Sequence, residues 1–596
     1  MLRAFRFKHS TKVGGGVEKT SDSFACFGQG KKSAFINIFA AKILIIKLFV
    51  KGICKKWVKL APYFLKKMEE LIKISQILNG YRIGKVDIIG NEDSESRHTE
   101  FFELLKAGKF KNDTEAAQYF YGKKATERSL AYRRFKSTFR ERLINTLFFI
   151  DVTHPDFNDL ESATMNIQKE WAAINILFAK GDLRLPMLLA ERLLPTAIKF
   201  ELTEIVVYIT DRLKNSYGGQ IGNIKKYTYY KWLQKEQMAI WQAEIQAKDL
   251  YQELRMHFIK STAHKPFVAK IAQQGLEELQ PACDKYKTIR LLYYVYIAKI
   301  GQYTTVNDYQ TASKLCDEAV EAFRSKPFEA QRLMNSFLNQ KLVCHIQLKE
   351  YKEGHTLLKE ILKHQVQGTL TWFKTLEHAT VLAFHTKNYQ EAYETYQKVR
   401  KDKAFRTLEL RHLEIWHLYS AYLHFLTAIG KVKATVKSLE IEDFKLNRFL
   451  NDVEVFGRDN AGMNISVLTV QVALQMTEGK FGKMIDSIDA LTKYRQRHLS
   501  KSHSLYRHNI FIKMVTQIPR SGFNKVELRR LTDVALRNMK ACPIQTDGLS
   551  FQAEIIPLED MWELLVEMVK NRFCRTYFQY NLHYLFVAIC HASSLF

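Results

Sequence analysis

The chain has 596 residues, of which 46% are hydrophobic, and it carries a formal net charge of +28. This length exceeds what one ordinary core supports, so we expect several domains or an elongated repeat array. Only 10 prolines and 26 glycines occur, which favours long uninterrupted helices and disfavours a many-turned β-sandwich. The predicted fold class is therefore all-α.

The eight cysteines are scattered, with no C-x-x-C pair and no regular spacing. Disulfide frameworks belong to small secreted domains. We therefore expect small apolar core cysteines in a reducing compartment, and hence a cytoplasmic protein. No close pair of Cys or His has ligand spacing backed by a second pair, so we expect no metal and no cofactor.

Residues 1–67 differ in character from the rest, with fifteen Lys and Arg against two acids. An apolar stretch over residues 34–50 contains Lys42 and Lys47, each costly at the centre of a bilayer. Several interpretations stay open: a disordered segment, a spanning or surface-lying membrane helix, or a non-native segment preceding a start at Met68.

Residues 68–160 are predicted to form a helical module. One helix is expected over residues 99–107, and Asn112 is placed to cap a second helix that ends at Gly122. A third helix is expected from Thr126 to about Phe149.

The third helix of this module has an apolar and a basic side. Its predicted buried seam steps by four residues through Ala131, Phe135, Phe139 and Leu143. Its basic residues are Arg133, Arg134, Lys136, Arg140 and Arg142.

Two helices joined by a Gly-containing turn, the second of them basic, resemble a helix-turn-helix DNA-binding unit. The resemblance implies that the five basic residues contact phosphates or base edges. A solvated basic face on a module that leads into the following helices is the alternative.

Two further stretches combine basic and aromatic residues, over residues 227–232 and from Lys493 to Arg507. Stacking on nucleic-acid bases is one interpretation. Packing in a core or along a groove is the alternative.

Residues 161–520 are expected to form an array of helical hairpins. One phrase recurs at intervals of 42 and 38 residues, with an aromatic residue and a small residue three positions later. Such recurrence is typical of stacked hairpins, in which the small residue permits close helix approach. The three pairs are Tyr309 and Ala312, Tyr351 and Gly354, and Tyr389 and Ala392. Looser versions lie at Val432 and Phe481.

The segments around Tyr351 and Tyr389 resemble tetratricopeptide repeats. Lys349 and Lys387 stand where the family places a small residue, and the spacing exceeds its 34 residues. The resemblance implies an α-α superhelix that binds a protein or peptide in a groove. Residues 521–596 are expected to supply a helical cap and an apolar tail.

No catalytic pattern such as G-x-S-x-G or H-E-x-x-H occurs, so we expect a non-enzymatic protein. Helical histidines and array carboxylates are interpreted as ordinary structural or solvated residues; these are His412, His417, His424, Glu360, Glu377 and Glu391.

The leading hypothesis is a protein- or peptide-binding scaffold. A transcriptional regulator with the basic module on DNA is the first alternative. A membrane-associated scaffold using residues 34–50 is the second.

Overall fold

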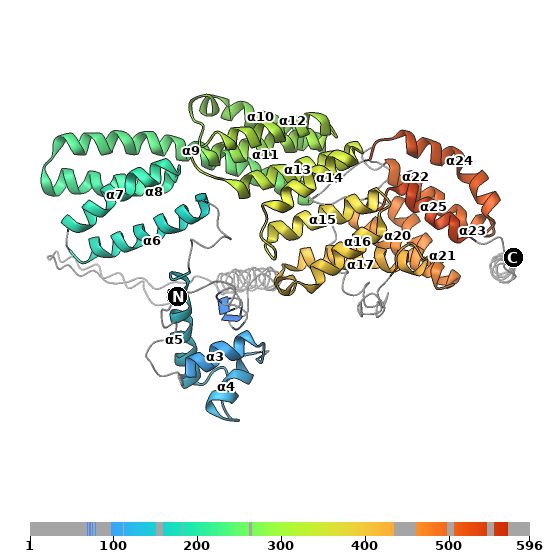
Figure 1. The fold of residues 1–596 in the computed structure, drawn as a ribbon, viewed down its shortest axis with the longest axis horizontal. Helices are drawn as coiled ribbons and strands as arrows, with labels where there is room; N and C mark the ends of the chain where they lie inside the picture. Colours follow the sequence, from blue (N-terminus) through green and yellow to red (C-terminus); the bar gives the residue numbers. More distant parts are fainter. Residues whose placement is uncertain are drawn as a thin grey trace, which may run out of the picture. The chain divides into compact units, whose positions relative to one another are not determined.

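The structure is a computed structural model, and every element of its described residues is a helix (Figure 1). The all-α prediction is thus confirmed for this part of the chain. The described residues are 68, 71–72, 74–75, 78, 97–110, 112–150, 159–181, 183–260, 265–433, 461–496, 506–544 and 554–569. They fall into two compact units, which divide between Phe149 and Ile150.

The first unit contains the three predicted module helices, α3 (Arg97–Lys106), α4 (Asp113–Tyr121) and α5 (Leu130–Leu147). Asn112 caps α4, since its side-chain oxygen accepts a hydrogen bond of 2.9 Å from the Glu115 backbone N–H. The third helix begins at Leu130 and not at Thr126. The predicted N-terminal cap is thus confirmed, and the predicted start of the third helix is wrong by four residues.

An aromatic core joins these helices. Phe101 of α3 is fully buried, and its ring centroid lies 5.3 Å and 4.7 Å from those of Phe135 and Phe139. Ala131, predicted to continue this seam, is exposed, and the larger Tyr132 is buried in its place. The seam therefore starts one position later, where a bulky ring can fill the space between α4 and α5.

The second unit is a succession of helices in which each packs against the next in the chain (Figure 1). Its first half comprises α6 (Asp159–Ala179), α7 (Arg184–Lys199), α8 (Thr203–Ser216), the π-helix η2 (Tyr217–Ile221), α9 (Ile224–Lys260), α10 (Lys265–Lys285), α11 (Ile289–Thr305) and α12 (Tyr309–Arg324).

The chain continues through α13 (Gln331–Leu348), α14 (Tyr351–Lys363), α15 (Leu370–His385), α16 (Tyr389–Lys401), the 3-10 helix η4 (Lys403–Thr407) and α17 (Leu410–Ala428). The last described helices are α20 (Ala461–Thr477), α21 (Phe481–Tyr494), α22 (Tyr506–Val515), α23 (Gln517–Arg520), α24 (Lys525–Ala541) and α25 (Leu558–Met568).

The recurring phrase marks one particular turn. Two residues before each aromatic, the backbone is left-handed, with φ of 63° at Asn307, 61° at Lys349 and 58° at Lys387. The next residue donates its N–H five positions back, as from Glu350 to the His345 carbonyl at 2.9 Å. This is the Schellman end of a helix, which reverses the chain in two residues and makes the neighbouring helices antiparallel.

Several predicted segments lie outside the described residues, namely the apolar stretch 34–50, the remainder of 1–67, and the apolar tail 577–596. Among the helices that the structure describes, none is long and apolar enough to cross a membrane.

Candidate functional site

The basic residues of α5 divide into two groups. Arg133, Arg134 and Arg140 are exposed. Lys136 instead forms an ion pair with Asp113 of α4, and its side chain is only 13% exposed. Arg142 lies 3.3 Å from the Nδ1 atom of His98, measured from Nη1. Three of the five predicted nucleic-acid residues are thus exposed, while Lys136 and Arg142 are less exposed and contact other residues of the module.

The connection between α4 and α5 also bears on the helix-turn-helix resemblance. It comprises residues 122–129, whereas the turn of that motif has about three to four residues. The connection that leads into the basic helix α5 is therefore longer than the resemblance implies.

The predicted repeat residues lie at helix junctions. Tyr309, Tyr351 and Tyr389 are the first residues of α12, α14 and α16. The small residues three positions later, Ala312 and Ala392 among them, are buried.

Gly354 is the small residue of the middle hairpin. A Cβ atom added there would lie 3.6 Å from Cδ1 of both Leu342 and Leu382, on α13 and α15. The small residue therefore sits where one hairpin meets the next.

A polar cavity opens between alternate helices of the second unit, α9, α11, α13, α15 and α17, with a volume of about 210 Å³. Its lining combines charged, amide, hydroxyl and apolar groups: Tyr251, Arg255, Tyr293, Ile297, Ile300, Gly301, Ser336, Asn339, Gln340, Thr371, Lys374, Glu377, His378 and His412.

Positive charge dominates the cavity lining. Among its described lining residues, Arg255 and Lys374 are the cations and Glu377 is the one acid. Desolvation, with a smaller contribution from Lys374, lowers the pKa of His378 to about 4, so this imidazole is neutral near pH 7. The cavity therefore favours a ligand with negative charge.

Glu377 and His412 form a buried pair within this lining. The Oε1 atom of Glu377 lies 3.0 Å from Nδ1 of His412, and their side chains are 9% and 4% exposed. The prediction that Glu377 is an ordinary solvated residue is wrong, because α17 packs over this face of α15. Glu377 accepts a hydrogen bond from His412 within the cavity wall, and this bond partly stabilises its negative charge.

One amide of the lining is oriented by its hydrogen bonds. The Asn339 side chain accepts from the Thr375 hydroxyl at 2.9 Å and donates to the Asn335 carbonyl at 2.8 Å. Its oxygen and one N–H are therefore engaged, which leaves at most one N–H for a ligand.

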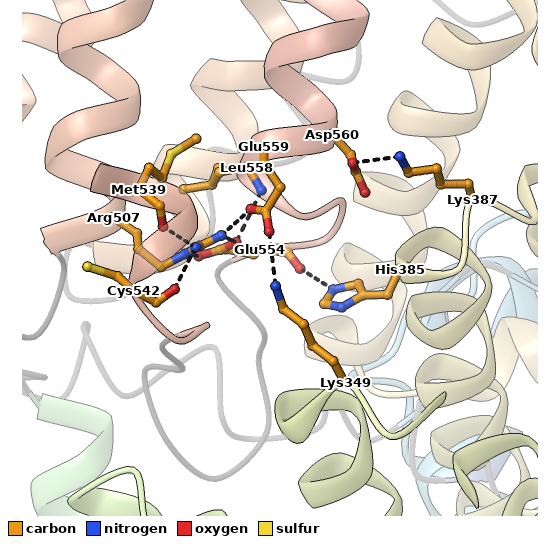
Figure 2. A network of polar contacts seen from close by, with 10 residues as sticks. All are labelled: Lys349, His385, Lys387, Arg507, Met539, Cys542, Glu554, Leu558, Glu559 and Asp560. Atoms are coloured by element: carbon orange, nitrogen blue, oxygen red, sulfur yellow. Dashed lines mark hydrogen bonds and ion pairs between the residues drawn. The ribbon is translucent and has the colours of Figure 1, made fainter. Parts of the chain in front are cut away.

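Arg507, the last residue of the second basic stretch, is not at the surface. It is fully buried, and its guanidinium donates to both oxygens of Glu554, at 2.7 Å and 2.9 Å, and to Glu559 (Figure 2). It also donates to the carbonyls of Met539 and Cys542. The nucleic-acid interpretation of this arginine is wrong, because all of its bonds serve to join α22, α24 and α25.

No protein family, no curated protein and no solved structure matches this chain. Among the described residues, no group of three or more His, Cys, Asp and Glu side chains could hold a metal ion. The function of the candidate site is therefore inferred from its geometry.

Sequence reasoning did not predict the cavity. Its residues are spread from Tyr251 to His412 and belong to five helices. The one signal available was the hairpin period, which places every second helix on the same side of an array.

Proposed function

We propose that this chain is a non-enzymatic, cytoplasmic scaffold that binds an acidic peptide segment of a partner protein. The observation that carries the proposal is the cationic polar cavity lined by five alternate helices. We further propose that these helices form the inner wall of a tetratricopeptide-like superhelix, which is the surface that solenoids use for extended ligands.

The size and chemistry of the cavity support a short acidic element. A water molecule takes up about 30 Å³ of liquid, so about 210 Å³ accommodates one or two side chains and not a folded domain. Lys374 and Arg255 can donate charge-assisted hydrogen bonds to a carboxylate. Tyr251 and Tyr293 offer aromatic surface to the rest of the peptide.

A peptide selection on the full chain tests the proposal. Random twelve-residue peptides displayed on phage should yield an enriched set containing Asp or Glu, and those peptides should bind the Lys374→Glu variant at least tenfold more weakly, a difference of about 1.4 kcal/mol. Lys352→Glu, at an exposed position of α14, is the matched control and should bind as the parent does. Selected peptides that bind all three proteins equally would remove the cavity from the proposal.

A second candidate function uses the first unit. The exposure of Arg133, Arg134 and Arg140 on α5 favours contact with nucleic-acid phosphates. Binding of the full chain to duplex DNA should weaken steeply with salt and fall when these three become Ala, with a smaller salt slope. Binding that does not depend on salt concentration, or that is unchanged by the triple substitution, would exclude this candidate.

A further inference from the structure

Three alternate helices, α13, α15 and α17, are each followed within three residues by a lysine that reaches the last described helix, α25. The Nζ atoms of Lys349, Lys387 and Lys431 lie 3.2 Å, 2.9 Å and 3.0 Å from carboxylate oxygens of Glu559, Asp560 and Glu567. All three acids belong to α25. Figure 2 shows the first two pairs, with Lys349 and Lys387 reaching α25 from separate turns.

The spacing of two of the acids, Asp560 and Glu567, fits the spacing of the turns that they meet. Asp560 and Glu567 are seven residues apart, which is about 10.5 Å along a helix. Packed helices lie about 8–10 Å apart. Asp560 and Glu567 of α25 can therefore contact two neighbouring turns while α25 stays straight.

Other contacts fix α25 in place. Its apolar side is buried, with Met561, Trp562 and Leu565 each at most 1% exposed. Four residues before α25 begins, the Glu554 carbonyl oxygen lies 2.9 Å from the Nε2 atom of His385, the last residue of α15. The apolar side therefore anchors the helix, and the acidic edge determines which turn each carboxylate meets.

The same array helices also line the polar cavity. Asn339 lies ten residues before Lys349 on α13, about 15 Å along the axis. Lys374 lies on α15, which ends two residues before Lys387. Because a short helix moves largely as a rigid unit, we expect a change in the spacing of the turns to change the separation of the cavity walls.

We propose that α25 is a strap whose acidic edge holds the turns after α13, α15 and α17 at a fixed spacing and thereby sets the width of the polar cavity. The strap acts on the same cavity as the proposed function. This proposal rests on that function only where it concerns ligand binding.

Hydrogen exchange of the full chain without ligand tests the strap. Lys387→Glu combined with Lys431→Glu puts like charges at two of the three pairs, and exchange at residues 558–568 should accelerate about tenfold. Adding Asp560→Lys and Glu567→Lys restores opposite charges with reversed polarity, and should return the exchange to near the parent rate. Lys352→Glu should change nothing. Unchanged exchange in the double variant, or acceleration that the reversed pairs do not correct, overturns the strap.

Chemical labelling of Lys374 tests the coupling to the cavity. Its rate of reaction with an acetylating ester, followed by mass spectrometry, should rise several-fold in the Lys387→Glu and Lys431→Glu variant and fall again in the charge-reversed protein. Faster exchange at α25 with constant labelling of Lys374 overturns the coupling. Neither measurement needs a peptide, so failure of the parent protein to bind acidic peptides would sink the proposed function alone.

Discussion

Replacement of Arg507 by Met is expected to be among the most damaging single changes in the second unit. The substitution keeps most of the side-chain volume but removes every hydrogen bond of the guanidinium, two of which go to Glu554. Glu554 is itself 1% exposed, so its carboxylate would remain buried without a counter-ion. Breaking a buried pair in this way costs about 3–5 kcal/mol.

The substitution also affects α25, because Glu559 on this helix loses its ion pair with Arg507. Urea unfolding of the parent and of Arg507→Met, followed by circular dichroism, should differ by about 3–5 kcal/mol, with the largest change in hydrogen exchange at residues 554–569. Adding Glu554→Gln removes the stranded charge and should recover part of the loss. A cost below about 1 kcal/mol, typical of an exposed pair, would refute the reasoning, and so would a failure of Glu554→Gln to help.

Three further predictions concern stability. Gly354→Ala should stabilise the chain by about 0.5–1 kcal/mol in thermal unfolding, because the added methyl meets neighbours only at ordinary contact distance; a loss would show that α14 needs glycine. Asn112→Ala should cost about 1 kcal/mol through the lost cap of α4, while Asn112→Asp should retain most of it. Desolvation raises the pKa of Glu559, but Arg507 and hydrogen bonding more than offset this and hold it below 4.5. The resulting stability is present above pH 4.5 and is lost as pH falls through the lower folded pKa, so the protection factors of α25, corrected for the intrinsic exchange rate at each pH, should fall in acid; constant protection factors contradict this.

The sequence alone predicted that the described chain is helical and where several of its helices begin or end. The low numbers of prolines and glycines predicted the all-α class of the described fold, because these residues interrupt helices. Asn112 could be predicted as a cap because capping involves residues only three positions apart. The recurring phrase, with a small residue three positions after the aromatic, was likewise a local pattern typical of helical hairpins.

The tertiary structure decided which polar residues meet. Glu377 and His412 are 35 residues apart, and Arg507 reaches Glu554 across 47 residues. No periodicity of a single helix encodes such pairs, because they depend on which helix covers which face. Lysines at two turns looked like departures from a repeat pattern, yet they pair with an acidic helix more than 170 residues later. Local sequence therefore determined the elements, and the buried, charged contacts were decided only by long-range packing, where desolvation makes the choice of partner costly to change.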